Sequence, residues 1–483
     1  MSRRRSLLLA IGMIAAGASS ARAENLDWPA LEDEAVRLLS RYLQLDTSNP
    51  PGNERLGADF FHALFEKEGI ESQIFESAPG RANIVARLPG DGSKPSVVLM
   101  HHMDVVPADA RFWKAKPFGG EIRDGYLWGR GALDVKGMGI TNAITLLALN
   151  REQASLQSDV VFLGVADEEA GGALGAGFMA EQHFELFANA GVVLNEGGFI
   201  AIDAAGAVRY YAVETAQKIP LWLRLTATGT PGHGSLPRPD TAPVRLVAAL
   251  ARITAYQTPL RVVPELQRFY ADTAHLETGP LRERLRDVKA ALEDPAFAAE
   301  FTAKPRQNAQ VRNTISVTVL SSGNKTNVIP PQATAELDIR LLPDQDPQAF
   351  LAELKRVIDD ESIAIETILS FPPASSPADH ELFAALREIA ERRHPGAVVA
   401  SPVATGFTDC HYFRERGIPC YGFTPFEASD RDVTLVHGND ERISLANVKS
   451  GARLSYELVS RLAGRQPLDP VGANIARSRA KPR

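Results

Sequence analysis

The sequence predicts an α/β protein in which a mostly parallel, twisted sheet is flanked by helices and a smaller α+β domain is inserted. In the first half of the chain, nearly unbroken apolar strands alternate with helical segments, a pattern typical of a buried parallel sheet. From about residue 216 the strands change to alternating apolar and polar residues, which is typical of a half-exposed sheet. The length of 483 residues also exceeds that of one typical domain.

The elements of the first half follow in order from hydrophobic spacing. Leu31, Ala35 and Leu38 recur at helical intervals and predict a helix over 30–70. Strands are then predicted within 82–90, 95–102, 159–169 and 190–198, and helices within 137–152 and 172–184. In open α/β sheets the carboxyl ends of the strands form the ligand site, so we expect the functional residues there.

The inserted domain is predicted over 216–371. Its order is strand, helix, strand, strand, helix, strand, at 219–230, 241–256, 313–323, 332–343, 347–359 and 363–370. Such an order suits a small α+β domain. Residues 258–310 form an additional charged segment that is predicted to be helical. The main domain then comprises 24–215 and 372–465, and the polar tail 466–483 is expected to be flexible.

The first 23 residues have the composition of a secretory signal peptide. A basic start, a short apolar middle and an Ala-Arg-Ala end precede Glu24. The apolar run, about a dozen residues, is short for a membrane span, although an uncleaved anchor stays open as an alternative. Arg3, Arg4 and Arg5 leave the twin-arginine route open as well. We therefore expect an exported protein, periplasmic or secreted, with no membrane span in the mature chain.

Charge and cysteine content exclude several classes. Without the four arginines of residues 1–23, 48 Lys and Arg remain against 59 Asp and Glu, a balance of −11. An acidic surface repels phosphate backbones, so no nucleic-acid partner is expected. Two cysteines, Cys410 and Cys420, are too few for a Cys₄ zinc site. They could form a disulfide or stay two buried thiols, and the sequence does not separate these alternatives.

Five stretches carry His, Asp or Glu at the end of an apolar segment or in a Gly-rich loop. They are HHMDVVP (101–107), GRGALDVKG (129–137), ADEEAGG (166–172), LNEGG (194–198) and VHGNDE (436–441). Each alone is more often a turn or a solvated acidic pair. Together they offer the imidazole and carboxylate ligands that Zn²⁺ and related ions prefer.

At these motifs the chain resembles the co-catalytic di-zinc peptidases, which include aminoacylase, glutamate carboxypeptidase, acetylornithine deacetylase and succinyl-diaminopimelate desuccinylase. H-x-D-V-V-P and G-R-G-x-x-D-x-K-G are the most specific motifs, and the resemblance spans nearly all of the mature chain. It implies that the main domain is catalytic and that the inserted domain is a lid or dimerisation domain. The segment 258–310 makes the chain most similar to the carboxypeptidase S branch.

The resemblance also implies roles for individual residues. The implied ligands of two Zn²⁺ ions per chain are His102, Asp134 as the bridge, Glu169, Glu196 and His437. Co²⁺ or Mn²⁺ could occupy the same ligands. Glu196 is preferred over Asn195 because an amide is a poor ligand beside a carboxylate. Asp104 would orient His102 through its second ring nitrogen, and Glu168 would be the general base. His101 is given no catalytic role.

Four further residues are implied to contact the substrate. By resemblance His233 donates a hydrogen bond to the oxyanion, often across a dimer interface, which implies a homodimer through the lid domain. Asn327 and Arg340 would hold the substrate, with Arg340 pairing with its free carboxylate, and Gly406 would lie near the same carboxylate. Without the family, His233 would be a turn residue and Arg340 a solvent-facing one.

The sequence therefore predicts an exported, metal-dependent amidohydrolase or carboxypeptidase. Its small-molecule substrates would be dipeptides or N-acyl amino acids with a free carboxylate, and Glu168 would activate the attacking water. One alternative is a catalytically inactive metal-binding or regulatory protein of the same fold. Another is a hydrolase that uses a serine or a cysteine.

Overall fold

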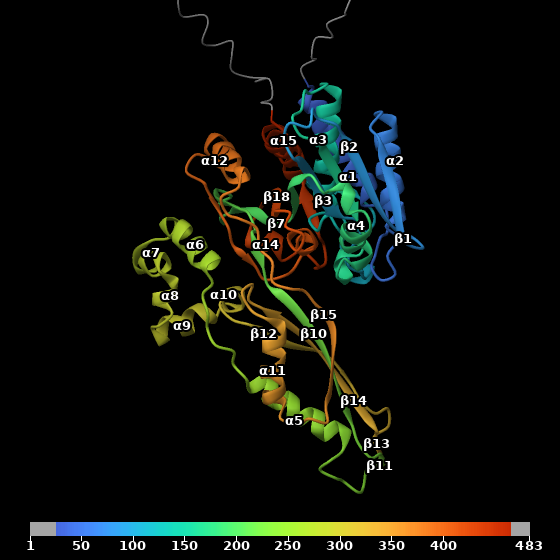
Figure 1. Ribbon diagram of the computed structural model, residues 1–483, viewed down its shortest axis with the longest axis vertical. Helices are drawn as coiled ribbons and strands as arrows, with labels where there is room; N and C mark the ends of the chain where they lie inside the picture. The colour runs from blue at the N-terminus through green and yellow to red at the C-terminus, as the bar shows by residue number, and fades with distance from the viewer. Residues whose placement is uncertain (1–25, 465–483) are drawn as a thin grey trace, which may run out of the picture.

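The computed structural model describes residues 26–464, so the predicted signal peptide and the tail 466–483 lie outside the described residues. Two sheets organise the chain, one in each domain (Figure 1). No helix within the described residues is long and apolar enough to cross a membrane.

The main domain is built on a mixed sheet of eight strands. The strands, in chain order, are β1 (Ser72–Ala78), β2 (Arg81–Leu88), β3 (Ser96–His102), β6 (Val160–Val165), β7 (Ala190–Ile202), β8 (Val208–Ala212), β16 (Val398–Ala400) and β18 (Cys420–Ala428). The central strands β6, β3, β7 and β18 are parallel. Antiparallel pairs extend this centre on both sides, β2 against β6 and β8 against β7. The predicted α/β class is confirmed.

Helices cover both faces of this sheet. Val97 and Leu99 of β3 pack into one apolar cluster, and Val98 and Met100 pack into another on the opposite face. The helices of the first cluster are α1 (Trp28–Tyr42), α2 (Arg55–Lys67), α3 (Lys136–Arg151), α12 (Glu381–Arg393) and α15 (Leu445–Leu462). The second cluster contains α4 (Phe178–Gln182) and α13 (Cys410–Arg414). Burial on both faces explains why the central strands are continuously apolar.

Two predicted helices differ from the structure. The single helix expected over 30–70 is wrong, because α1 and α2 are separated by a loop that contains Pro50 and Pro51, and proline cannot continue a helix. Within 172–184 only α4 is α-helical, after an irregular π-helical turn at Ala173–Gly177. A side chain at Gly175 would lie 1.7 Å from the carbonyl oxygen of Ala166, so only glycine fits there.

The inserted domain has a four-stranded antiparallel sheet in the order β12-β14-β10-β15. Its strands are β10 (Ile219–Thr228), β12 (Thr314–Ser321), β14 (Gln332–Leu341) and β15 (Ala364–Ser370), and its helices are α5 (Ala242–Ala255) and α11 (Pro347–Ile358). Each element lies within its predicted range. A small antiparallel pair of β11 (Gly232–His233) and β13 (Val328–Ile329) lies at the end farthest from the main domain (Figure 1), and we call this end the tip.

The segment 258–310 is helical, as its composition predicts. It consists of α6 (Pro264–Thr273), α7 (Gly279–Arg286), α8 (Val288–Ala291), α9 (Pro295–Thr302) and α10 (Pro305–Gln310). These helices share their own apolar cluster, which includes Ala400 of β16. The helical insertion, as we call α6–α10, therefore packs beside the main domain and not at the tip formed by β11 and β13 (Figure 1).

The two cysteines form a disulfide. Cys410 begins α13 and Cys420 begins β18, and both side chains are fully buried. The bond joins the helix after the 402–409 loop to a central strand of the sheet. The structure thus decides between the two alternatives, a disulfide and two buried thiols, that the sequence left open.

Candidate metal centre and active site

The five predicted ligands meet at the carboxyl ends of the central strands. His102 ends β3, and Glu169 lies in a 3₁₀ turn (Glu168–Ala170) directly after β6. Glu196 lies in β7, just beyond the residues that pair with β3. Asp134 precedes α3, and His437 follows the short helix α14 (Asp430–Val433). Strands of one direction end at one edge of a sheet, which brings these distant motifs together.

The ligand atoms form two groups that share Asp134. His102 Nε2 lies 3.1 Å from Asp134 Oδ1 and 3.6 Å from Glu196 Oε2. His437 Nε2 lies 3.0 Å from Asp134 Oδ2 and 3.2 Å from Glu169 Oε2. Within each group the ligand atoms are within 4.8 Å of one another. Asp134 thus directs one carboxylate oxygen into each group, which is the arrangement of a bridging ligand.

The donor set fits two divalent cations. Each group offers one imidazole nitrogen and two carboxylates, which suit Zn²⁺ and similar ions. Among the described residues, Glu169 Oε1 is buried and has no hydrogen-bond partner. Burial and the charge of Asp134 raise the pKa of Glu169 to about 7. Crowded carboxylates of this kind are stabilised by a cation between them.

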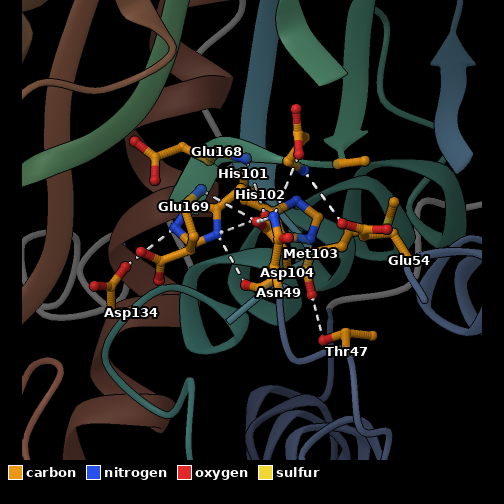
Figure 2. Close-up of polar contacts among 12 residues, drawn as sticks. Thr47, Asn49, Glu54, His101, His102, Met103, Asp104, Asp134, Glu168 and Glu169 are labelled. Atoms are coloured by element: carbon orange, nitrogen blue, oxygen red, sulfur yellow. Dashed lines mark hydrogen bonds and ion pairs between the residues drawn. The ribbon is translucent and has the colours of Figure 1, made fainter. Parts of the chain in front are cut away.

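Asp104 positions both a ligand and the neighbouring turn (Figure 2). His102 Nδ1 lies 3.0 Å from the backbone oxygen of Asp104 and 3.4 Å from its Oδ1, so the ring is held mainly by the backbone carbonyl. The Asp104 carboxylate accepts hydrogen bonds from the backbone N–H groups of Glu168 and Glu169, at 3.2 and 3.1 Å. Asn49 donates a third at 2.8 Å. One side chain therefore ties β3 to the turn after β6.

Glu168 is buried and directly precedes the predicted ligand Glu169. Its carboxylate belongs to neither of the two ligand groups. Burial raises the pKa of its carboxyl well above the usual range, and the negative charge of Glu196 adds to the effect. A carboxylate with a raised pKa is a better proton acceptor. The arrangement can therefore combine cation binding with proton transfer at one edge of the sheet.

Sequence reasoning missed Glu441, which holds the ligand loops together. Its buried carboxylate accepts hydrogen bonds from the backbone N–H of Leu133 at 2.8 Å and of Asp134 at 3.1 Å. It also pairs with Arg130 Nη1 at 2.8 Å. Glu441 thereby fixes the loop of Asp134 to the loop of His437. In the sequence, this role of Glu441 is indicated only by its place as the last residue of the VHGNDE motif.

A second missed group lies behind the turn that carries Glu168. Arg81 pairs with Glu54 and with Asp167, each at 2.7 Å, and the Glu54 side chain is fully buried. Asp167 has a left-handed backbone with φ of 71°, and its ion pair holds it in that uncommon conformation. Nothing in the sequence around Glu54 or Arg81 indicates this contact.

His101 is a core residue, which agrees with giving it no catalytic role. Its ring packs against Phe61 and Phe162, with centroids 5.3 and 5.2 Å away. Burial lowers the pKa of His101 to about 3, so the ring is neutral at physiological pH. The HH pair therefore places one histidine in the core and one at the site.

Two predicted substrate residues are not brought to this site. His233 is exposed in β11, at the tip of the inserted domain, where its Nδ1 accepts a hydrogen bond from the backbone of Ser235. Asn327 lies beside it, because its carbonyl accepts a hydrogen bond from Gly234 N–H. In Figure 1 the β11–β13 pair lies at the bottom of the molecule, well below β7 and α14, which adjoin the ligands. His233 belongs to neither ligand group of its own chain.

Arg340 and Gly406 lie where the two domains meet. Arg340 of β14 pairs with Asp338 at 2.6 Å, and its guanidinium lies 4.9 Å from the ring centroid of Phe407. Phe407 follows Gly406, which lines a cavity of about 610 Å³ together with Gly197. Gly197 is the neighbour of Glu196. Gly406 therefore lines a cavity that also borders the residue after Glu196, and Arg340 contacts the wall of this cavity at Phe407.

Residues 98–461 match the sequence profile of Peptidase family M20/M25/M40. The N-fatty-acyl-amino acid synthase/hydrolase PM20D1 of Xenopus tropicalis is 34% identical over 438 residues, which cover 88% of this chain and 84% of the relative. Aminoacylase-1B of Rattus norvegicus is 28% identical over 90% of this chain and 97% of its own.

Solved structures share the fold at lower identity. The M20 family metallo-carboxypeptidase Sso-CP2 from Sulfolobus solfataricus superimposes with a TM-score of 0.67 at 21% identity, over 89% of this chain and 99% of that one. Human carnosine dipeptidase 1 gives a TM-score of 0.65 at 17% identity, over 90% and 98% of the two chains. The predicted α/β fold is thus shared with these proteins.

Proposed function

Because the chain belongs to Peptidase family M20/M25/M40 and is a metal-dependent hydrolase, we propose that it hydrolyses the amide bond of N-acyl amino acids with a free carboxylate. The observation that carries the proposal is the pair of ligand groups sharing Asp134, with Glu168 beside them. The names of its relatives, an N-fatty-acyl-amino acid synthase/hydrolase and an aminoacylase, support acyl amino acids over dipeptides.

In this mechanism the chain binds the ions and moves the protons. His102, Asp134 and Glu196 would hold one ion, and Asp134, Glu169 and His437 the other. Bound there, two zinc, cobalt or manganese ions would supply the positive charge that lowers the pKa of a water and stabilises an oxyanion. Glu168 accepts the proton of the attacking water and then donates it to the leaving amine as the C–N bond breaks.

The presence of Glu168 and Asp134 argues against an inactive binding protein. An inactive binding protein would be expected to have lost the base or the shared ligand, and both Glu168 and Asp134 are present. A panel of N-acyl amino acids and dipeptides, assayed with metal analysis of the same sample, tests the proposal. We expect hydrolysis that a chelator abolishes and that an active-serine reagent leaves unchanged. Inhibition by the serine reagent alone would contradict it.

Replacing Arg340 with methionine is expected to raise KM for N-acyl amino acids by about 10- to 100-fold. A hydrogen bond to a charged group contributes roughly 1.5–3 kcal/mol, and the guanidinium would lose its pairing with the substrate carboxylate. Steady-state kinetics with an N-acyl amino acid and with its amide, which lacks the carboxylate, measure the effect. The amide should respond weakly to the substitution.

Arg224→Met is the matched control. Arg224 lies on the neighbouring strand β10 and pairs with Glu336 at 2.9 Å, as Arg340 pairs with Asp338. It should leave KM within about twofold of wild type, since surface ion pairs contribute little. Equal KM values for the Arg340 and Arg224 variants would remove Arg340 from the substrate site.

We also propose a homodimer through the inserted domain. The support is the position of His233 and Asn327, which lie at the tip of the inserted domain and away from the ligand groups of their own chain. In a dimer the tip of one protomer could reach the site of its partner. Light scattering of the mature chain measures the mass directly, and a monomer at all assayed concentrations would contradict the proposal.

Export is proposed on two grounds. Residues 1–23 have the composition of a signal peptide, and a disulfide between Cys410 and Cys420 suits an oxidising compartment such as the periplasm or the exterior. Cell fractionation with N-terminal sequencing tests this. We expect a mature chain that begins at Glu24, and an intact Met1 in the cytosolic fraction would overturn the proposal.

A further inference from the structure

We propose that the cavity between the helical insertion and the main sheet binds the acyl chain of the substrate. The inference rests on the proposed hydrolysis of N-acyl amino acids and assigns the recognition of long apolar chains to residues of α6–α10. The cavity has a volume of about 610 Å³, which is within the range of roughly 300–1,000 Å³ that is usual for small-molecule sites.

One end of the cavity adjoins the metal groups. Gly197 and Gly198 line it, and they directly follow the predicted ligand Glu196 in β7. Gly406, from the loop at the domain junction, lines it as well. None of the five ligands lines the cavity itself, so the acyl chain of an amide held at the ligand groups would enter the cavity past Gly197 and Gly198.

The far walls are apolar and come from the helical insertion. The side chains that line them are Phe269, Leu276, Leu281, Leu285, Phe297 and Phe301. Phe269, Leu285, Phe297 and Phe301 belong to one apolar cluster with Val403 of the junction loop. Residues of α6, α7 and α9, with Leu276 between α6 and α7, thus converge on a space that an alkyl chain could fill with favourable loss of water contact.

Two pairs of the polar side chains that line the walls contact each other. Tyr270 Oη donates a hydrogen bond to Gln310 Oε1 at 2.8 Å, and Arg209 pairs with Glu277 at 2.7 Å. Other polar residues also line the cavity, among them the exposed Glu300, Lys304 and Arg306, and Glu214. An alkyl chain would be favoured against the phenylalanine and leucine side chains, where it displaces water without separating a polar group from its partner.

The chain length of the substrate tests the inference on the metal-loaded enzyme. We expect kcat/KM for one amino acid acylated with two to sixteen carbons to rise by about fourfold per methylene, the factor that corresponds to burial of one methylene. The rise should level off when the cavity is filled. Hydrolysis with no dependence on chain length would overturn the inference and leave the proposed function intact.

Leu281→Glu tests the cavity itself, because it places a charge in the apolar wall at a half-exposed position that tolerates one. We expect kcat/KM for the N-dodecanoyl substrate to fall at least about tenfold, and that for the N-acetyl substrate to stay within twofold. Leu260→Glu is the matched control. Both leucines are 37% exposed, but Leu260 does not line the cavity. An equal loss with both substrates, or in both variants, would overturn the inference.

Direct binding separates a failure of the cavity from a failure of the proposed function. Calorimetric titration of N-dodecanoyl-phenylalanine into the full-length protein should give an affinity that Leu281→Glu weakens at least tenfold and Leu260→Glu does not. If the protein binds this ligand as expected but hydrolyses no N-acyl amino acid, the assignment of the cavity to the acyl chain stands and the proposed function is rejected. No binding to the wild-type protein, or equal binding to the wild type and both variants, would overturn the assignment of the cavity to the acyl chain.

Discussion

The Glu168→Gln variant is expected to lose activity by roughly 10²–10⁴-fold in kcat, the contribution typical of general acid–base catalysis. Glutamine has nearly the same shape but cannot accept the proton of the attacking water. Because Glu168 belongs to neither ligand group, the variant should still bind close to two metal ions per chain. Stopped assays of kcat combined with metal analysis of the same preparation measure both quantities.

Glu68→Gln is the control for this substitution. Glu68 lies in the same domain with 15% of its side chain exposed, and it pairs with Arg151 at 2.7 Å. Its replacement should leave kcat and metal content unchanged, because it contacts no residue of the site. A Glu168→Gln enzyme with kcat near the wild-type value would assign the base to another group. Loss of metal from that variant would instead make Glu168 a ligand.

Asp134→Asn is expected to reduce bound metal to less than one ion per chain and activity by more than about a hundredfold. Each oxygen of Asp134 belongs to a different ligand group, so one substitution weakens both sites. Even residues that only support a metal ligand typically contribute 10- to 100-fold, and a shared ligand should contribute more. Thermal stability should fall as well, because bound ions stabilise the folded state by mass action.

Glu196→Gln gives the necessary contrast. Glu196 belongs to the His102 group alone, so its replacement should leave about one ion per chain. Metal analysis after dialysis, with thermal unfolding at fixed metal concentration, distinguishes the two variants. Equal metal content in the Asp134 and Glu196 variants would mean that the two sites do not share Asp134.

The centre of the fold and the ligand cluster could be predicted because local signals are strong there. Strands buried on both faces must be apolar throughout, so β3 and β6 are evident in the sequence. His102 and Asp134 lie in motifs whose position at strand ends is itself informative. That the five residues meet is a finding of the structure, and that they bind two ions on this chain stays a prediction.

Other features depend on contacts between distant segments and leave no local signal. Glu441 holds backbone groups about 300 positions earlier in the chain, and no spacing rule indicates such a pair. The edge strand β1 has a half-exposed, mixed sequence and was not predicted. The position of His233 also follows from the length of the antiparallel strands β10 and β14, because the segments at their far ends lie away from the main domain.

The remote position of the β11–β13 pair has a consequence for how the enzyme would behave at low concentration. If each metal centre is completed by a neighbouring copy, turnover per molecule depends on how often copies are associated. Dilution would then lower specific activity before any unfolding occurs, and the loss would be reversed on concentration. Were the chain also exported, as we propose, its activity per molecule would be highest close to the cells that release it.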